Sequence, residues 1–311
     1  MTIDPTRGIA GLKGALGYVR AYRDHVFVVK MGGDVQGDSE VLDQVAAQVS
    51  LLSSLGIRIV VVHGGGPQAS ALSRRLGVEP RMVAGRRVTD DHALEVAKMV
   101  YAGALNTDVV CALRVNEVQA VGLTGVDGDL LQARRRPPVE VRTDEGPMEL
   151  VDFGHVGDIE KVDPRLLTTL LDARFVPVVA SLAGDADGRV YNVNADTVAE
   201  SIAIALGAHK LIFMTGAPGV LRDRNDPSSL VTFADPDDLE GLMASGALVG
   251  GMRPKVEACI RAATSGVERT HIIDGRAPDS LLLEVFTGAG TGTMIVGRKE
   301  KATYLDVDLA G

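Results

Sequence analysis

The chain has 311 residues, 46% of them hydrophobic, which suits one large α/β domain or two lobes that share a sheet. Its net charge of −9 argues against a general nucleic-acid-binding protein. No segment reaches the ~18 consecutive apolar residues of a membrane span. Residues 1–14 lack the pattern of a secretory signal. We therefore expect a cytoplasmic protein that binds neither nucleic acid nor membrane.

The first elements repeat one pattern. Residues 10–22 predict an amphipathic helix that precedes the core. The strand 26–30 then runs into a glycine turn, and a helix follows over about 39–55. A second strand, 59–62, ends in His63-Gly-Gly-Gly66, before a helix with Pro67 in its first turn. Strand, glycine turn and helix in succession predict a parallel sheet with crossover helices.

The rest of the chain continues in the same style, without internal repeats. Residues 132–160 are rich in Pro, Arg, Glu and Gly and predict hairpins or an excursion from the sheet. Further helices are predicted over 90–116, 196–206 and 252–265, and further strands over 118–123, 175–180, 190–193, 210–214, 269–273 and 293–296.

Two other features predict ordinary structural roles. Cys111 and Cys259 stand in helix-like segments without metal-ligand spacing, and we expect reduced core thiols. The basic run 134–136 precedes two prolines and predicts a solvated turn. No metal site is predicted, because no histidine pair has zinc-site spacing.

The two glycine turns are candidate anion cradles. Glycines let the backbone approach an anion closely, and the first N–H groups of a helix point at it. Lys30 stands directly before one turn, and Lys255 follows a third glycine turn at residues 250–251. Two lysines on glycine turns suit phosphoryl transfer, which needs positioning and cations. Three glycines alone are equally compatible with a loop that binds nothing.

Three further candidates surround this arrangement. Asp196 either caps a helix or holds the two lysines in register. Arg86 and Arg87 either clamp a carboxylate or lie on the surface. His63 is better interpreted as a strand-end residue than as a base, and a carboxylate acceptor, ionised at neutral pH, needs no base. A P-loop and a G-x-G-x-x-G after the first strand are both missing.

Eight motifs, spanning nearly the whole chain, together resemble those of acetylglutamate kinases of the amino-acid kinase family. They are Lys30-x-Gly-Gly, Val62-His-Gly-Gly-Gly-Pro67, Gly85-x-Arg-Val-Thr-Asp90, Gly122-Leu-x-Gly-x-Asp-Gly128, Gly154-x-Val-Gly157, Asn192-Val-Asn-Ala-Asp196, Gly251-Met-x-Pro-Lys255 and Asp274-Gly-Arg276.

The resemblance implies an α/β fold, an open three-layer αβα sandwich with a mainly parallel central sheet. It implies an N-terminal helical extension (1–24), a lobe that binds the acyl amino acid and dimerises (25–180), and an ATP-binding lobe (181–311). The implied reaction is ATP-dependent phosphorylation of the γ-carboxylate of N-acetyl-L-glutamate to N-acetyl-L-glutamyl 5-phosphate, the second step of arginine biosynthesis. Mg²⁺ would be bound mainly by the nucleotide phosphates rather than by the protein.

Site residues carry over by position in the motifs. The resemblance implies that Lys30 and Lys255 stabilise the transferring phosphoryl group and that Asp196 organises them. It assigns other residues to the phosphates and nucleotide: Gly32, Gly33, Thr215, Gly216, Gly219 and Met252. It assigns Gly65, Gly66, Arg87 and Asn192 to the substrate, with both glycines also offering N–H groups to the phosphates.

The N-terminal helix also resembles that of arginine-inhibited members, which form hexameric rings of dimers. This implies an arginine site at Tyr18, Lys210, His271, Glu284 and Gly292, and a nitrogen-regulatory protein is a further partner in such systems.

The chain departs from the family pattern at Gly216, where aspartate is usual, and at Thr107 and Met31. Two alternatives remain: a kinase for carrier-linked aminoadipate or glutamate, and a non-catalytic arginine-sensing module.

Overall fold

The computed structural model describes residues 16–142, 148–248, 250–287 and 290–297. Within this range, residues 16–22 are helical, and the rest of the predicted N-terminal helix lies outside the described residues. The strands are β1 (Val26–Met31), β2 (Arg58–His63), β3 (Met82–Val83), β4 (Arg86–Arg87), β5 (Ala120–Thr124), β6 (Leu131–Arg135), β7 (Val139–Arg142), β8 (Met148–Val151), β9 (Gly157–Val162), β10 (Val176–Ala180), β11 (Leu182–Gly184), β12 (Val190–Asn192), β13 (Lys210–Thr215), β14 (Phe233–Ala234), β15 (Arg269–Asp274) and β16 (Thr293–Val296).

Helices follow most of the strands, as the strand–turn–helix pattern predicts. They are α2 (Gly33–Gln36), α3 (Ser39–Ser54), α4 (Gly66–Arg75), α5 (Asp91–Ala97), the π-helical η1 (Lys98–Leu105), α6 (Asn106–Val115), the short η2 (Asp127–Asp129), α7 (Arg165–Asp172), α8 (Ala195–Ala205), the short η3 (Pro227–Ser229), α9 (Pro236–Ala244), α10 (Met252–Thr264) and α11 (Ser280–Phe286).

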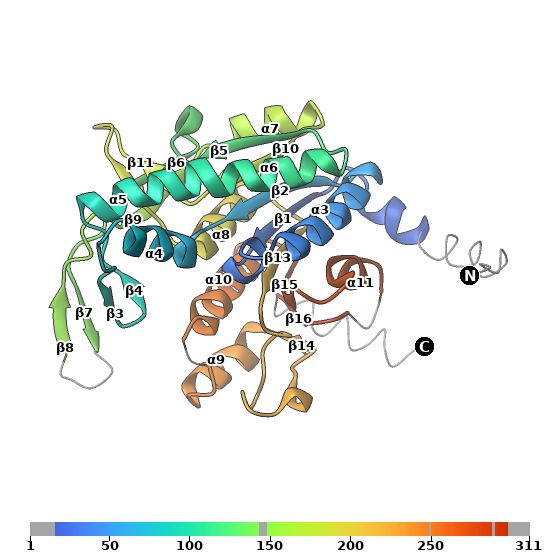
Figure 1. Cartoon of the computed structure of the whole chain (residues 1–311). Coiled ribbons are helices and arrows are strands. Elements are labelled where there is room, and N and C mark those ends of the chain that lie inside the picture. Colours follow the sequence, from blue (N-terminus) through green and yellow to red (C-terminus); the bar gives the residue numbers. More distant parts are fainter. Residues whose placement is uncertain (1–15, 143–147, 249, 288–289, 298–311) are drawn as a thin grey trace.

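An eight-stranded sheet in the order β14-β16-β15-β13-β1-β2-β10-β5 forms the centre of the molecule (Figure 1). Its strands from β15 to β5 are parallel, whereas β16 runs antiparallel to β15. Parallel strands bring the glycine turns after β1 and β2 to the same edge of the sheet, where open α/β sheets bind ligands. The mainly parallel sheet predicted from the sequence is confirmed.

Helices cover both faces of this sheet, so the fold is the expected three-layer sandwich. Alternate residues of β1 point to opposite faces: Phe27 and Val29 pack in one core cluster and Val28 in the other. The first cluster includes α3, α6 and α11, and the second includes α7, α8, α9 and α10. The sheet is therefore buried on both sides, as its continuous apolar strands require.

The predicted excursion over residues 132–160 contains β7 and β8 and most of β6 and β9, which pair outside the main sheet. Strands β12, β11, β6 and β9 form a second sheet, and two hairpins, β3–β4 and β7–β8, are paired by themselves. Hairpin β7–β8 projects from the body on the side where α4 and β3–β4 lie (Figure 1). Hairpin β3–β4 and the residues that follow β6 and β8 line one side of the site described below.

Two expectations about single segments need correction. The run 134–136 is not a turn: Arg134 and Arg135, both exposed, end β6, and the half-buried Arg136 after it forms an ion pair with Asp158. Of the two unbonded cysteines only Cys259 is a core thiol, because Cys111 is exposed.

The helical run 91–115 is, within the described residues, the one helix long and apolar enough to cross a membrane, yet it packs against α3 and β5 in the core.

Candidate active site

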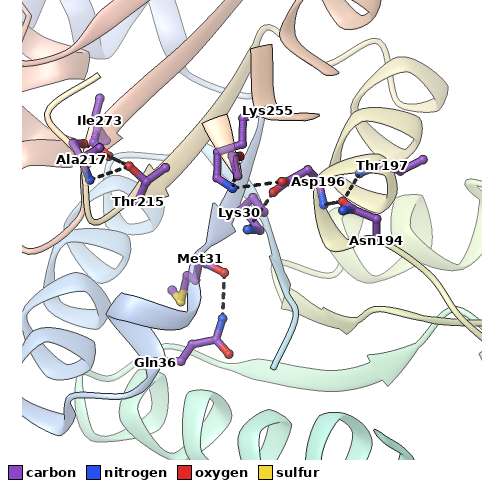
Figure 2. Close-up of polar contacts among 11 residues, drawn as sticks. Lys30, Met31, Gln36, Asn194, Asp196, Thr197, Thr215, Ala217, Lys255 and Ile273 are labelled. Carbon is purple, nitrogen blue, oxygen red and sulfur yellow. Dashed lines mark hydrogen bonds and ion pairs between the residues drawn. The ribbon is translucent and has the colours of Figure 1, made fainter. Parts of the chain in front are cut away.

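The site begins with a buried aspartate between two lysines. Asp196 Oδ1 lies 2.7 Å from Lys30 Nζ, and Asp196 Oδ2 lies 3.1 Å from Lys255 Nζ. Figure 2 shows the three side chains converging from β1, α8 and α10. We call Lys30, Asp196 and Lys255 the cleft triad. Two positive charges share one negative charge, so the cluster favours a further anion.

Burial and the neighbouring charges shift the pKa values of Lys30 and Asp196. Burial lowers the pKa of Lys30, and the opposing charge of Asp196 offsets only part of that effect. For Asp196 burial acts to raise the pKa, but the two ammonium groups outweigh it and hold the pKa below its ordinary value. The carboxylate is therefore ionised at neutral pH and fixes both lysines.

Asp196 is free for this role because another residue caps its helix. Asn194 Oδ1 accepts hydrogen bonds from the N–H groups of Asp196 and Thr197, at 2.7 and 3.2 Å (Figure 2). The helix-capping interpretation of Asp196 is therefore wrong, and Asn194 is the N-cap of α8. The Asn192–Asp196 motif thus combines a cleft residue, a cap and a charge within five positions.

Lys30 and Asp196 of the triad line a cleft of about 690 Å³ between the glycine turns and hairpin β3–β4, whereas Lys255 is not among the lining residues, although Pro254 before it is. Of the residues expected in the site, those that line it are Lys30, Gly33, Gly65, Gly66, Arg87, Asn192 and Asp196. Helix α4 starts at Gly66 and α8 at Ala195, so two helix N-termini face the cleft. N-terminal N–H groups favour anions. The arrangement can hold and neutralise a multiply charged group.

Arg87 and Asn192 are held in place before any ligand arrives. Arg87 Nη2 donates to the carbonyl of Gly66 at 2.7 Å and also to the Ser70 hydroxyl. Asn192 Nδ2 donates to Thr89 Oγ1 at 3.1 Å. Both side chains are tied to backbone elements and still line the cleft, so their remaining N–H groups are positioned for a ligand.

The glycine turn after β1 differs from expectation at one position. The Gly32 N–H donates to the carbonyl of Met214 at 2.9 Å, so it is not available to a phosphate. Glycine is still required there, because a Cβ would lie 2.8 Å from that carbonyl oxygen. Gly33 lines the cleft and begins α2. The predicted pair of phosphate donors is therefore reduced to Gly33.

The expected nucleotide residues lie beside the cleft rather than on its wall. Thr215 uses its hydroxyl within its own turn, accepting from the Ala217 N–H and contacting the Ala217 carbonyl at 3.0 Å (Figure 2). The carbonyl of Gly216 accepts from Arg276, and Met252 opens α10. None of these three, nor Gly219, belongs to the residues that line the 690 Å³ cleft.

At the Gly216 departure the neighbouring side chain is acidic. A Cβ at Gly216 would lie 2.6 Å from Asp34 Oδ2, so the Asp34 carboxylate takes the space that a side chain at 216 would use. A carboxylate is therefore present beside this loop, carried by α2 instead of by residue 216.

His63 is a structural residue, as its place at the end of β2 predicts. It is fully buried, its Nδ1 lies 2.9 Å from the Gly64 carbonyl, and its Nε2 lies 3.0 Å from Asn106 Nδ2. Burial lowers its pKa to about 4. The neutral ring donates to Gly64 and accepts from Asn106, which leaves it no free nitrogen to act as a base.

Three of the residues expected to bind arginine, Lys210, His271 and Glu284, are buried on β13, β15 and α11. Lys210 Nζ lies 3.2 Å from His271 Nε2, and His271 Nδ1 lies 2.7 Å from Glu284 Oε1. Glu284 Oε2 accepts from the Gly292 N–H at 3.2 Å, and Tyr18 packs against Phe286. Hydrogen bonds thus connect Lys210, His271, Glu284 and Gly292, while Tyr18 is near this group through Phe286 of α11.

Several cleft residues were not anticipated from the sequence. Ser181 directly follows β10, and this position at the carboxyl end of a strand was a usable signal. The others carry no comparable signal, because they reach the cleft only through tertiary packing. They are Tyr101, Arg136, Phe153, Val156 and Arg261.

Comparison with known proteins agrees with this geometry. The model of the amino acid kinase family matches residues 25–274. Acetylglutamate kinase of Myxococcus xanthus is 48% identical over 289 residues, covering 92% of this chain and 94% of that protein. Acetylglutamate kinase of Methanothrix thermoacetophila is 43% identical over 281 residues, covering 90% and 96%.

Solved structures show the same fold in other enzymes. N-acetylglutamate synthase from Neisseria gonorrhoeae, complexed with coenzyme A and N-acetyl-glutamate, has a TM-score of 0.79 and 29% identity. That match covers 93% of this chain and 63% of the synthase. Carbamate kinase from Giardia lamblia, at a TM-score of 0.63 and 16% identity over 88% of this chain and 99% of that chain, shares the fold. The chain therefore belongs to the amino-acid kinase family, and within it to the acetylglutamate kinases.

Proposed function

We propose that this cleft transfers the γ-phosphoryl group of ATP to the γ-carboxylate of N-acetyl-L-glutamate, giving N-acetyl-L-glutamyl 5-phosphate in arginine biosynthesis. The observation that carries the assignment is the cleft triad, in which one buried carboxylate holds two lysines at a cleft. The identity of 43–48% with acetylglutamate kinases, over 90% or more of the chain, supports the substrate.

The roles of the triad follow from charge. Lys30 and Lys255 lie where negative charge spreads over the equatorial oxygens of a transferring phosphoryl group, and Asp196 keeps them fixed. The γ-carboxylate attacks as the ionised form that prevails at neutral pH, so no base is required. The attacking oxygen forms the new P–O bond as the bond to ADP breaks.

Other residues bind the two substrates. Arg87 and Asn192 grip the acyl amino acid, while Gly33, Gly65 and Gly66 present backbone N–H groups to its reacting end and to the phosphates. The nucleotide lies toward Thr215, Gly216, Gly219 and Met252. Mg²⁺ would be bound mainly by the nucleotide phosphates, where it would neutralise negative charge. The described residues contain no group of three His, Cys, Asp or Glu side chains suited to a metal.

Three further proposals concern the lobes and oligomeric state, an arginine site and a regulatory partner. Residues 25–180 form the acyl-amino-acid lobe and 181–311 the ATP lobe of a homo-oligomer, a dimer or a hexameric ring of dimers, in the cytoplasm. The cluster of Lys210, His271 and Glu284, with Tyr18 and Gly292 beside it, is the arginine site. A nitrogen-regulatory protein is a candidate partner.

The assay is ATP-dependent formation of an acyl phosphate, trapped with hydroxylamine. N-acetyl-L-glutamate, L-glutamate and L-aspartate are compared, each with and without arginine, and carrier-linked aminoadipate is added as the competing acceptor. Activity on N-acetyl-L-glutamate alone is expected. Activity confined to the carrier-linked acceptor, or none with any acceptor from folded protein, would overturn the assignment.

A further inference from the structure

The long helix beside the glycine turn has an irregular middle. Residues Lys98–Leu105 are π-helical between α5 and α6. A π-helical segment bonds each N–H to the carbonyl five residues before, is rare, and is often found at functional sites. Here it includes Tyr101, the residue of this helix that lines the cleft.

The Tyr101 ring packs directly on the glycine turn. A Cβ at Gly65 would lie 2.6 Å from Tyr101 Cδ1 and 2.5 Å from Leu105 Cδ1. Residue 65 must therefore be glycine for the helix to come this close. The ring is in turn held against the backbone that begins α4, so its position is fixed.

The hydroxyl of this tyrosine is the exceptional feature. Tyr101 is only 4% exposed, and no hydrogen bond joins its hydroxyl to any of the described residues. The hydroxyl oxygen is nevertheless not among the fully enclosed polar atoms that lack a partner, so it is accessible from the cleft that Tyr101 lines. Buried phenols normally pair their hydroxyl, and here the cleft is where a ligand can supply the partner.

The surroundings define the chemistry of that ligand. The positive charge of Arg87 acts on the phenol, although burial dominates and raises its pKa. The phenol therefore remains protonated at neutral pH and can donate. Arg87 has Nη2 committed to Gly66 and Ser70 and offers its other N–H groups. A neutral donor beside a guanidinium suits an anionic oxygen acceptor.

We propose that the Tyr101 hydroxyl is a specificity-determining donor that, together with Arg87, binds the non-reacting α-carboxylate of the acyl amino acid. The inference rests on the function proposed above, in which the γ-carboxylate faces the cleft triad. The α-carboxylate is then the remaining anionic group of the substrate, and the Tyr101–Arg87 pair is a matched donor set on the cleft wall.

The test compares two ligands that differ only in this group. N-acetyl-4-aminobutyrate is N-acetyl-L-glutamate without the α-carboxylate. Binding of both is measured by calorimetry to the wild type and to Tyr101→Phe, which keeps the ring on Gly65 and removes only the hydroxyl. Tyr101→Phe should weaken binding of N-acetyl-L-glutamate about 10- to 100-fold, the range for a hydrogen bond to a charged group. Binding of the aminobutyrate analogue should not change.

The kinetic readout is a rise in KM for N-acetyl-L-glutamate with little change in kcat or in KM for ATP. An equal loss on both ligands would assign the hydroxyl to the acetyl group or to packing, and unchanged binding of both would leave it without a role; either overturns the proposal. Because binding is measured without ATP, it reports on Tyr101 even if the kinase assay fails. Unfolding midpoints of the two proteins confirm that Tyr101→Phe is folded.

Discussion

Two buried lysine clusters in this fold differ in how completely their charges are satisfied. The cleft triad joins two lysines through one carboxylate, and two of its members, Lys30 and Asp196, line a 690 Å³ cleft. The second cluster, Lys210, His271 and Glu284, which we call the inner triad, lies between β13, β15 and α11. It holds one lysine and one carboxylate joined through a histidine, with each charged residue at most 6% exposed.

The inner triad satisfies its own hydrogen bonds. Glu284 Oε2 accepts from the N–H groups of Thr291 and Gly292, at 2.6 and 3.2 Å. Burial alone would raise the pKa of Glu284, but His271 and these N–H groups outweigh it and lower the pKa to about 2. Burial of a lysine therefore does not by itself mark an active site. The cleft triad is distinguished by its surplus positive charge and its access to a cleft.

The largest expected effect is at the carboxylate of the cleft triad. Asp196→Asn keeps the shape but leaves two ammonium groups close together with no compensating charge, so they move apart and Lys30 loses its fixed position. We expect kcat to fall by at least about 100-fold, comparable with the loss of a transition-state donor. Steady-state kinetics measure it. A kcat within about threefold of the wild type would show that Asp196 is not what organises the lysines.

The comparison also shows what the sequence could reveal. The glycine turns and apolar strands predicted the parallel sheet, and Lys30 and Asp196 were predicted together because each stands at a strand end or helix start. Tyr101 and Arg136 could not be predicted, since they reach the cleft through a π-helical turn and a second sheet. The role of Asn194 as the cap depended on backbone geometry that the Asn192–Asp196 letters leave ambiguous.

The next prediction concerns the pH dependence of stability, which depends on two buried histidines, His63 near the cleft triad and His271 in the inner triad. Burial lowers the pKa of His63 and of His271 to about 4, from 6.5. Between pH 6.5 and 4 the unfolded chain therefore binds a proton that the folded chain does not. The free energy of unfolding falls as the pH drops through this window, by about 1.4 kcal/mol per pH unit for each histidine and about 3 kcal/mol in total for each.

Substituting each histidine measures its share. In His271→Gln and in His63→Gln, the slope of unfolding free energy against pH between 6.5 and 4 should decrease by about one proton each, and by two in the double variant. Urea unfolding at several pH values gives the slopes. Slopes equal to that of the wild type would mean that both rings already bind a proton in the folded state.

The smallest expected effect separates stability from catalysis. Glu284→Gln leaves one oxygen where two accept hydrogen bonds, so its amide group faces either the His271 ring or the Thr291 and Gly292 N–H groups. We expect unfolding free energy to fall by about 1–3 kcal/mol with kcat unchanged, because the inner triad does not touch the cleft. Arginine inhibition, if the wild type has it, should weaken, as the arginine-site proposal requires. A loss of kcat like that of Asp196→Asn would contradict the distinction, since it would mean that the enclosed charges also act on the reaction.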